Sequence, residues 1–275
     1  MHRASPGGSA LTLVLLLGAS GVARAATPTD DLPRLDERTA LMIGANRLKV
    51  GVLSFDYGLV ERVSIGTDPP AWAARAFYPV LIPNAHVKVS LFQRGPVAVT
   101  GQGAGYYLVL RQNGSATGSL VSVPVSLFAS VRFQPRVWLH GEGAYVFVCG
   151  FGSGDLNASG INGQVAAQAA QGAAMLEWRV TRIFSLTALG RYQFWTGPLA
   201  FEGTGTLDPY TSVNVDGTAK PRVEHPWMAI GGVALLWRHF HLIAGAGYGY
   251  YFVPGIDIAY PNKGFVPDLS ASFVL

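Results

Sequence analysis

Apolar and small polar residues alternate strictly at the C-terminal end, in Leu269-Ser270-Ala271-Ser272-Phe273-Val274-Leu275. Successive side chains of a β-strand point to opposite faces, so the pattern predicts a strand with one apolar and one polar face. Similar alternation from about Thr39 onward predicts twelve strands in all. The predicted strands are Thr39–Ala45, Leu48–Phe55, Glu61–Thr67, Ala85–Phe92, Val97–Leu110, Leu120–Phe133, Val137–Gly150, Val165–Val180, Phe184–Thr196, Trp227–Trp237, Phe240–Phe252 and Pro267–Leu275.

Tight and long connections alternate between these strands. The tight ones are Asp56–Val60, Gln93–Pro96, Gln134–Arg136, Thr181–Ile183 and Arg238–His239. The long ones are residues 68–84, 111–119, 151–164, 197–226 and 254–266. An even number of strands with this alternation is typical of a transmembrane antiparallel up-and-down β-barrel, with short periplasmic turns and long extracellular loops. Both termini then fall in the periplasm, and ten strands remain the alternative count.

The alternation also assigns the two faces of each strand. In Leu120–Phe133 we expect Val125 and Leu127 to face lipid, and Ser126 and Ser130 to face the lumen. Charged residues fall mostly on the inner parity. The polar residues that this register places on the lumen wall are Lys49, Arg62, Lys88, Arg132, His140, Glu142, Glu177, Arg179, Arg191 and Gln193.

Aromatic residues on the outward parity form two groups. One group lies near the tight turns: Phe133, Trp178, Phe184, Phe240 and Phe273. The other lies toward the long loops: Tyr107, Tyr145, Tyr192, Phe194, Tyr248 and Tyr250. Two bands about 25 Å apart are the girdles expected at the two interfaces of an outer membrane. Trp227–Trp237 is apolar on both faces, which suggests a strand that a loop covers on the inside.

The N-terminal residues have the pattern of an export signal. A short basic start, an apolar core over Ala10–Ala19 and the small-x-small site Ala23-Arg24-Ala25 predict a cleaved signal peptide over residues 1–25. We expect a short periplasmic segment over residues 26–38 and the barrel over residues 39–275. Hydrophobic residues make up 49% of the chain, yet it holds no apolar run long enough for a membrane-spanning helix. Cleavage lowers the formal charge from +4 to +2, too little to indicate a nucleic-acid partner.

The signal peptide, the alternating strands and the C-terminal strand together resemble those of Gram-negative outer-membrane β-barrel proteins. The assembly machinery of that class recognises a last strand with alternate apolar residues and usually a terminal aromatic; here Leu275 takes that place and Phe273 lies two residues earlier. The run Gly51–Thr67 is similar to a hairpin common in uncharacterised barrels of this kind. The resemblance implies outer-membrane lipid, lipopolysaccharide and the barrel-assembly machinery as partners.

The patterns that invite a chemical interpretation fit structural roles better. The Gly-rich stretches 101–105, 150–154 and 245–249 lack the spacing and the helix of a dinucleotide site. His239 and His241 have no nearby carboxylate or thiol that would complete a metal site. His140 and Glu142 share one face and could form an acid–base pair, but a hydrogen-bond network in the lumen wall is the favoured interpretation. We therefore expect no catalytic, cofactor or metal site.

A barrel of about twelve strands has a lumen wider than one that side chains fill and narrower than that of the large porins. Cations exceed carboxylates on the predicted inner wall, so the leading hypothesis is a small pore with a mild anion preference for small solutes. The main alternative is a barrel plugged by side chains and loops, with a structural or surface-interaction role. Two further alternatives are a lipid-modifying barrel enzyme, for which no outward Ser–His pair is available, and a soluble periplasmic barrel of lipocalin type.

Overall fold

The computed structural model describes residues 38–70, 80–111, 117–156, 159–208, 211–219, 225–237, 239–252 and 259–275. The expected signal peptide therefore lies outside the described residues. Among those that are described, no helix has the length and hydropathy needed to cross a bilayer. The strands are β1 (Leu48–Gly51), β2 (Phe55–Val60), β3 (Val63–Thr67), β4 (Val80–Leu81), β5 (Asn84–Arg94), β6 (Val97–Arg111), β7 (Thr117–Gln134), β8 (Val137–Leu156), β9 (Ser159–Arg179), β10 (Phe184–Thr196), β11 (Leu199–Asp208), β12 (Thr211–Ala219), β13 (Trp227–Trp237), β14 (Phe240–Phe252) and β15 (Ala259–Val274).

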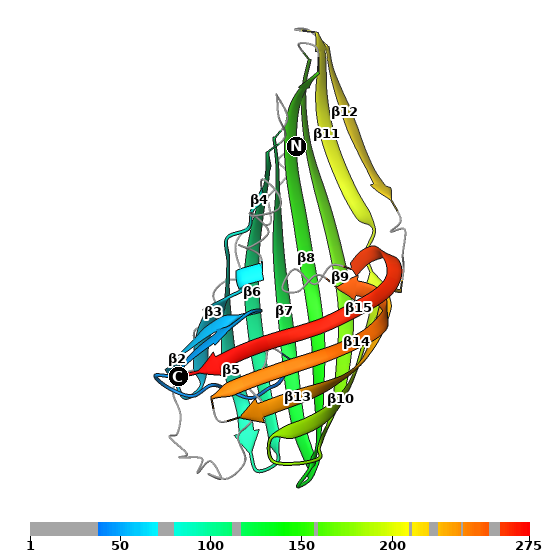
Figure 1. Ribbon diagram of the computed structural model, residues 1–275. Coiled ribbons are helices and arrows are strands. Elements are labelled where there is room, and N and C mark those ends of the chain that lie inside the picture. Colours follow the sequence, from blue (N-terminus) through cyan, green and yellow to red (C-terminus); the bar gives the residue numbers. More distant parts are fainter. Residues whose placement is uncertain are drawn as a thin grey trace.

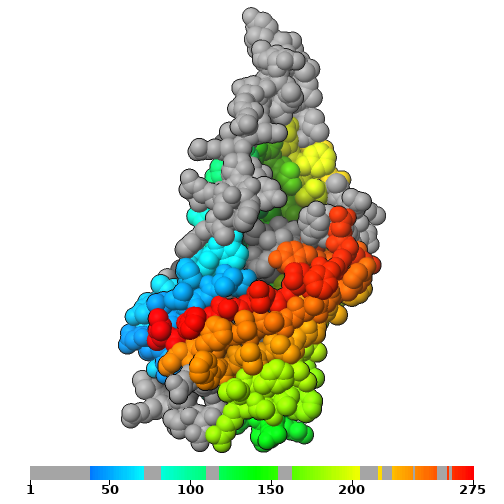
Figure 2. Space-filling model, viewed as in Figure 1, coloured from blue at the N-terminus to red at the C-terminus, as the bar shows by residue number. Residues whose placement is uncertain are grey.

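Twelve antiparallel strands close into a barrel, as the alternation predicts (Figure 1). The ring runs β1-β2-β3-β5-β6-β7-β8-β9-β10-β13-β14-β15 and returns to β1. At the seam Lys49 pairs with Val274, and the backbone groups of Leu48 and Leu275 exchange two hydrogen bonds. Figure 2 shows this seam from outside, with the C-terminal strand lying against the N-terminal strands. Closure satisfies the edge backbone groups that an open sheet would leave unpaired.

The predicted register of β7 is confirmed. Val125 and Leu127 expose 56% and 52% of their surface on the outside, whereas Ser126 and Ser130 are buried on the inside. The outer surface also carries exposed aromatic residues near the tight turns, such as Phe133, and others toward the opposite end. Contiguous exposed apolar surface of this extent is unusual for a protein surrounded by water.

Several strands continue further into the predicted long connections than the sequence patterns indicated. β8 and β9 remain paired up to Leu156 and Ser159, so only residues 157–158 separate them. The predicted loop 197–226 contains the hairpin β11–β12, and β11 pairs with the upper part of β9. Gly, Pro, Asn and Asp residues recur in these stretches and indicate loops by composition, but strands form where neighbouring strands supply the backbone hydrogen bonds. These strands form a tall wall above one side of the barrel (Figure 1).

The prediction of a strand over Thr39–Ala45 is wrong, and so is the tight turn over Asp56–Val60. Residues 39–45 form no strand, while the range Leu48–Val60 supplies two strands, β1 and β2, so the total stays at twelve. The chain reverses immediately before β1, where Gly44 and Asn46 have φ angles of 82° and 57°. Gly and Asn are the residues that tolerate this left-handed conformation best, and they end any strand at this point.

Gly58 was interpreted as a turn residue, but it lies in β2 for a steric reason. A Cβ atom at this position would lie 1.7 Å from the carbonyl oxygen of Gly44. The absence of a side chain on β2 therefore allows the preceding segment to pass directly against the inner face of the wall.

Candidate functional site: the barrel interior

A segment of the chain lies inside the barrel, which we call the inner segment (residues 38–43). Thr39 and Ala40 expose 0% and 1% of their surface, and Ile43 exposes 7%. The segment descends through the lumen, leaves it at the tight-turn end and reverses into β1. This placement could not be predicted from the sequence, because a segment surrounded by a barrel wall also alternates polar and apolar residues.

Three polar contacts attach the inner segment to three different parts of the wall. The guanidinium of Arg38 donates two hydrogen bonds, 2.7 and 2.8 Å long, to the carboxylate of Asp268 on β15. Lys88 Nζ on β5 donates to the carbonyl oxygen of Thr39 at 2.5 Å. The backbone N–H of Ala40 donates to Ser130 Oγ on β7 at 2.8 Å.

Apolar contacts complete the attachment at the tight-turn end. Ala40 packs with Ala98 and Phe128, and Ile43 packs with Val274 of the closing strand. Leu41 lies against both groups. The inner segment thus occupies the part of the lumen that lies between β6, β7 and β15.

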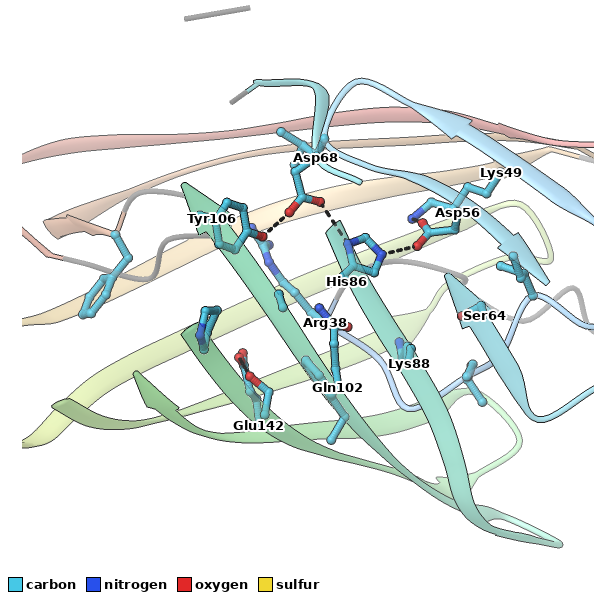
Figure 3. Close-up of a pocket in the computed structure, with 18 of the residues that line it drawn as sticks. Arg38, Lys49, Asp56, Ser64, Asp68, His86, Lys88, Gln102, Tyr106 and Glu142 are labelled. Carbon is cyan, nitrogen blue, oxygen red and sulfur yellow. Dashed lines mark hydrogen bonds and ion pairs between the residues drawn. The ribbon is translucent and has the colours of Figure 1, made fainter. Parts of the chain in front are cut away.

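A chain of ionic groups lines the wall above the inner segment (Figure 3). His86 Nε2 lies 2.6 Å from Asp56 Oδ1, and His86 Nδ1 lies 3.6 Å from Asp68 Oδ1. Lys49 Nζ lies 3.4 Å from Asp56 Oδ2, and Tyr106 donates its hydroxyl proton to Asp68. Gly66 makes this arrangement possible, since a Cβ there would lie 2.4 Å from His86 Nε2. β1, β2, β5, β6 and the residue that follows β3 together position this network.

A second network fills the tight-turn end below. Ser130 Oγ lies 2.8 Å from His140 Nδ1, and His140 Nε2 lies 3.4 Å from Glu177 Oε2. Glu177 Oε1 also accepts hydrogen bonds from Arg179 at 3.2 Å and from Ser185 at 2.9 Å. Glu177 is 0% exposed, so its charge depends on these partners.

This Ser–His–Glu sequence of contacts has the composition of a nucleophilic triad but not its accessibility. Ser130, His140 and Glu177 expose 0%, 1% and 0% of their surface, and the Ser130 oxygen already accepts a hydrogen bond from Ala40. A nucleophile needs room for an acyl group beside it, and Ala40 occupies that room at Ser130. The contacts instead lock β7, β8, β9 and β10 together at this end.

The possible acid–base pair of His140 and Glu142 does not form. His140 contacts Ser130 and Glu177, whereas Glu142 Oε2 lies 2.8 Å from a guanidinium nitrogen of Arg191. Arg191 also lies over the ring of Phe252, with 5.4 Å from Cζ to the centroid. The two residues were grouped because they share one strand face, but the partners of His140 lie on the adjacent strands β7 and β9, and the partner of Glu142 lies on β10, two strands away.

Nine of the ten predicted lumen residues point into the barrel in the described structure. Seven of them are buried: Lys49, Lys88, His140, Glu177, Arg179, Gln193 and, by its side chain, Glu142. Arg191 and Arg132 are partly buried, and Arg132 lies over the ring of Trp138 at 5.7 Å. Arg62 is the exception and corrects the prediction, because it lies exposed in the turn between β2 and β3. The turn lies at this position because β2 extends to Val60 and β3 begins only at Val63, whereas the predicted strand began at Glu61.

The wall formed by β9, β10, β13, β14 and β15 carries an apolar patch on its inner side. We call this patch the inner apolar cluster; it comprises Met175, Leu189, Met228, Ile230, Phe252 and Val266. Its signal in the sequence was the strand Trp227–Trp237, which is apolar on both faces. Among the described residues, neighbouring strands supply the partners of its inner face.

A cavity of about 150 Å³ lies between the inner segment and the walls. Its cationic lining residues are Arg38, Lys49, Lys88 and Arg191, and its carboxylates are Asp56, Asp68 and Glu142. Met228 and Phe252 of the inner apolar cluster also line it. The cavity therefore meets charged groups on one side and apolar groups on the other.

The positions considered for metal or phosphate chemistry lie apart. His241 is buried on β14, whereas His239 is exposed in the preceding turn. Within the described ranges, no three His, Cys, Asp or Glu residues come close enough to hold a metal ion. The described glycines of the three Gly-rich stretches lie on β6, β8 and β14, without a following helix.

No protein-family profile and no curated protein matches the chain. Solved structures that are similar in fold include the translocator domain of the autotransporter NalP from Neisseria meningitidis, with 12% identity, a TM-score of 0.48 and coverage of 83% of each chain. A mutant of the TodX monoaromatic hydrocarbon channel shares 13% identity over 84% of this chain and 67% of its own, with a TM-score of 0.45. The copper transporter OprC shares 12% identity over 83% of this chain and 41% of its own, with a TM-score of 0.43. Each of these likenesses is limited to the barrel fold.

Proposed function

We propose that this protein is a small-solute channel of the bacterial outer membrane, and that the inner segment closes it in the described conformation. The observation that carries the proposal is a lumen that has a charged wall and a cavity. The inner segment occupies this lumen and is attached to the wall by polar contacts. A barrel that served only as a scaffold could be filled by side chains of its own wall.

The outer surface supports the membrane location. Phe133, Trp178 and Trp237 expose 65%, 51% and 60% of their surface near the tight turns, and Tyr248 and Phe265 expose 56% and 73% toward the opposite end. Aromatic residues at two levels, with valines and leucines such as Val125 between them, match the girdles and the apolar band of an outer-membrane barrel. Lipopolysaccharide and the barrel-assembly machinery are the partners that this location implies.

Water can replace the wall as the hydrogen-bond partner of the inner segment. Neutral hydrogen bonds contribute about 0.5–1.5 kcal/mol each, and hydrogen bonds to charged groups about 1.5–3 kcal/mol each. Two conformations separated by a few kcal/mol leave the minor one populated at ~0.1–10%. We therefore expect brief, infrequent openings of the wild-type channel rather than a steady current.

Planar-bilayer recordings of the mature chain and of a variant that lacks residues 38–43 test this proposal. The wild-type protein should show rare opening events, and the deletion variant should conduct for most of the recording. Faster migration of the unboiled sample in a gel would verify that the deletion variant has folded. A folded deletion variant without any current would contradict the channel.

The second candidate is a plugged barrel with a structural role, which the network at Glu177 favours. His140, Glu177 and Arg179 are buried at the tight-turn end and belong to the wall itself, so they would remain after the inner segment has left. In this case the deletion variant would stay closed to ions of every size. The same recordings therefore distinguish the two candidates.

A further inference from the structure

The cavity between the inner segment and the walls has two chemically different sides. Met228 and Phe252 continue the inner apolar cluster into it, while Arg38, Lys88 and Glu142 approach from the charged walls and the inner segment. A ligand that matches both sides needs an apolar body and a charged group.

Cations and aromatic rings lie directly together at this cavity. Arg191 lies over the Phe252 ring at 5.4 Å, and Lys88 Nζ lies over the Phe128 ring at 5.1 Å. Arg191 is also the cross-strand partner of Met228 in the ladder of β10 and β13. An aromatic body that packs on Met228 and Phe252 is therefore held close to positive charge, which favours an anionic substituent.

Arg38 is the cation that a ligand can reach most easily. Its side chain is 25% exposed, against 3% for Lys49 and 11% for Arg191. The guanidinium of Arg38 presents a planar pair of donors to Asp268, a geometry that suits any carboxylate. A ligand carboxylate can take the place of Asp268 without leaving the guanidinium unpaired.

We propose that the cavity binds a small amphipathic carboxylate, with its apolar body on Met228 and Phe252 and its carboxylate on Arg38 in place of Asp268. A cavity of about 150 Å³ is the size that accepts one benzene ring in a protein interior. The inference rests on the proposed channel function and names its substrate class. Since the Arg38–Asp268 pair fixes the inner segment to β15, binding of the substrate also releases one attachment of the segment that closes the pore.

Benzoate, benzyl alcohol and acetate are suitable probes for calorimetric titration of the purified mature protein in detergent. Benzyl alcohol keeps the ring but lacks the charge, and acetate keeps the charge but lacks the ring. Benzoate should bind at least tenfold more tightly than either. Equal affinities for benzoate and acetate, or for benzoate and benzyl alcohol, would overturn the assignment.

Two substitutions in the Arg38–Asp268 ion pair should change benzoate binding in opposite directions. Arg38→Gln should remove the preference for benzoate over benzyl alcohol, while Asp268→Asn should strengthen benzoate binding because it removes the competing carboxylate. Phe252→Ala should weaken benzoate and leave acetate unchanged. Arg62→Gln is the matched control, since Arg62 lies exposed in the β2–β3 turn away from the cavity. Unaltered benzoate affinity in either Arg38→Gln or Asp268→Asn would refute the site, so one folded variant is enough for the test.

The outcome separates this inference from the channel itself. If the variant without residues 38–43 conducts but the wild-type protein does not prefer benzoate, the binding site is wrong and the channel stands. If benzoate binds as expected but no variant conducts, the site stands and the channel is wrong.

Discussion

Arg38 and Asp268 form a bidentate ion pair, with hydrogen bonds of 2.7 and 2.8 Å, across 230 positions of sequence. The pair joins the start of the inner segment to the last strand of the barrel. Its removal should therefore loosen the segment without affecting the strand ladder. We expect Arg38→Glu to raise the open probability in bilayer recordings at least tenfold, because two carboxylates then face each other.

The reversed pair provides the control. Adding Asp268→Arg to Arg38→Glu restores opposite charges at the same two positions and should return the recordings toward the wild-type level. A double variant that stays as open as the single variant would mean that the pair does not hold the inner segment.

The glycine of β2 offers a steric test that replaces no charged residue. A Cβ on Gly58 would meet the Gly44 oxygen at 1.7 Å, so Gly58→Ala should displace the inner segment and increase conductance. Gly103→Ala is the matched control, because a Cβ on that strand glycine meets nothing within 4 Å. Similar recordings for both variants would show that the close approach at Gly58 does not matter.

The register of the wall predicts unequal costs for one substitution at adjacent positions. Val125→Arg places a charge on the outer surface, where it should cost ~2–4 kcal/mol near the middle of a bilayer. Ser126→Arg places the charge inside the barrel and should cost much less. The native Ser126 hydroxyl lies 3.5 Å from a carboxylate oxygen of Glu142, so a cation at this position has an anion nearby. Urea unfolding in the presence of lipid vesicles measures both. The opposite order would show that the apolar face of β7 does not meet lipid.

The buried carboxylate at the tight-turn end should dominate the stability of that end. Glu177→Leu removes the partner of Arg179 and Ser185 and should lower the free energy of unfolding by ~3–5 kcal/mol, since it leaves a buried cation uncompensated. Glu202→Gln alters an exposed carboxylate that pairs with Gln164, and should change stability by less than ~1 kcal/mol. Equal effects would mean that water reaches Glu177.

Much of the wall could be predicted from the sequence because lipid outside and polar groups inside impose a period of two. Val125 and Ser126 illustrate this: their positions follow from alternation alone. The same rule failed at residues 39–45. Thr39 and Ile43 are buried because they contact the inner face of the barrel, and they do not belong to a strand of its wall. Asp56 and Gly58 were mistaken for turn residues, although Asp56 pairs with His86 and Gly58 makes room for Gly44.

The interior site could be predicted only as a list of inward residues. Alternation gives the face of Glu142 and of His140 but not the partner of either, because partners such as Arg191 and Glu177 lie on other strands. The Arg38–Asp268 pair depends on closure of the whole barrel. Contacts of this range need a three-dimensional structure.

The most direct test of the closed channel is a reversible cross-link of the inner segment to the wall. Ala40 N and Ser130 Oγ lie 2.8 Å apart, so the two residues are in contact, and Ala40→Cys with Ser130→Cys, in a chain with Cys149→Ser, is the pair to cross-link. Mass measurement verifies the disulfide, and single-channel conductance is then recorded before and after addition of a reductant. We predict no openings while the disulfide is intact and openings once it is reduced. Equal current in the two states would contradict the account, because ions would then pass without movement of residues 38–43.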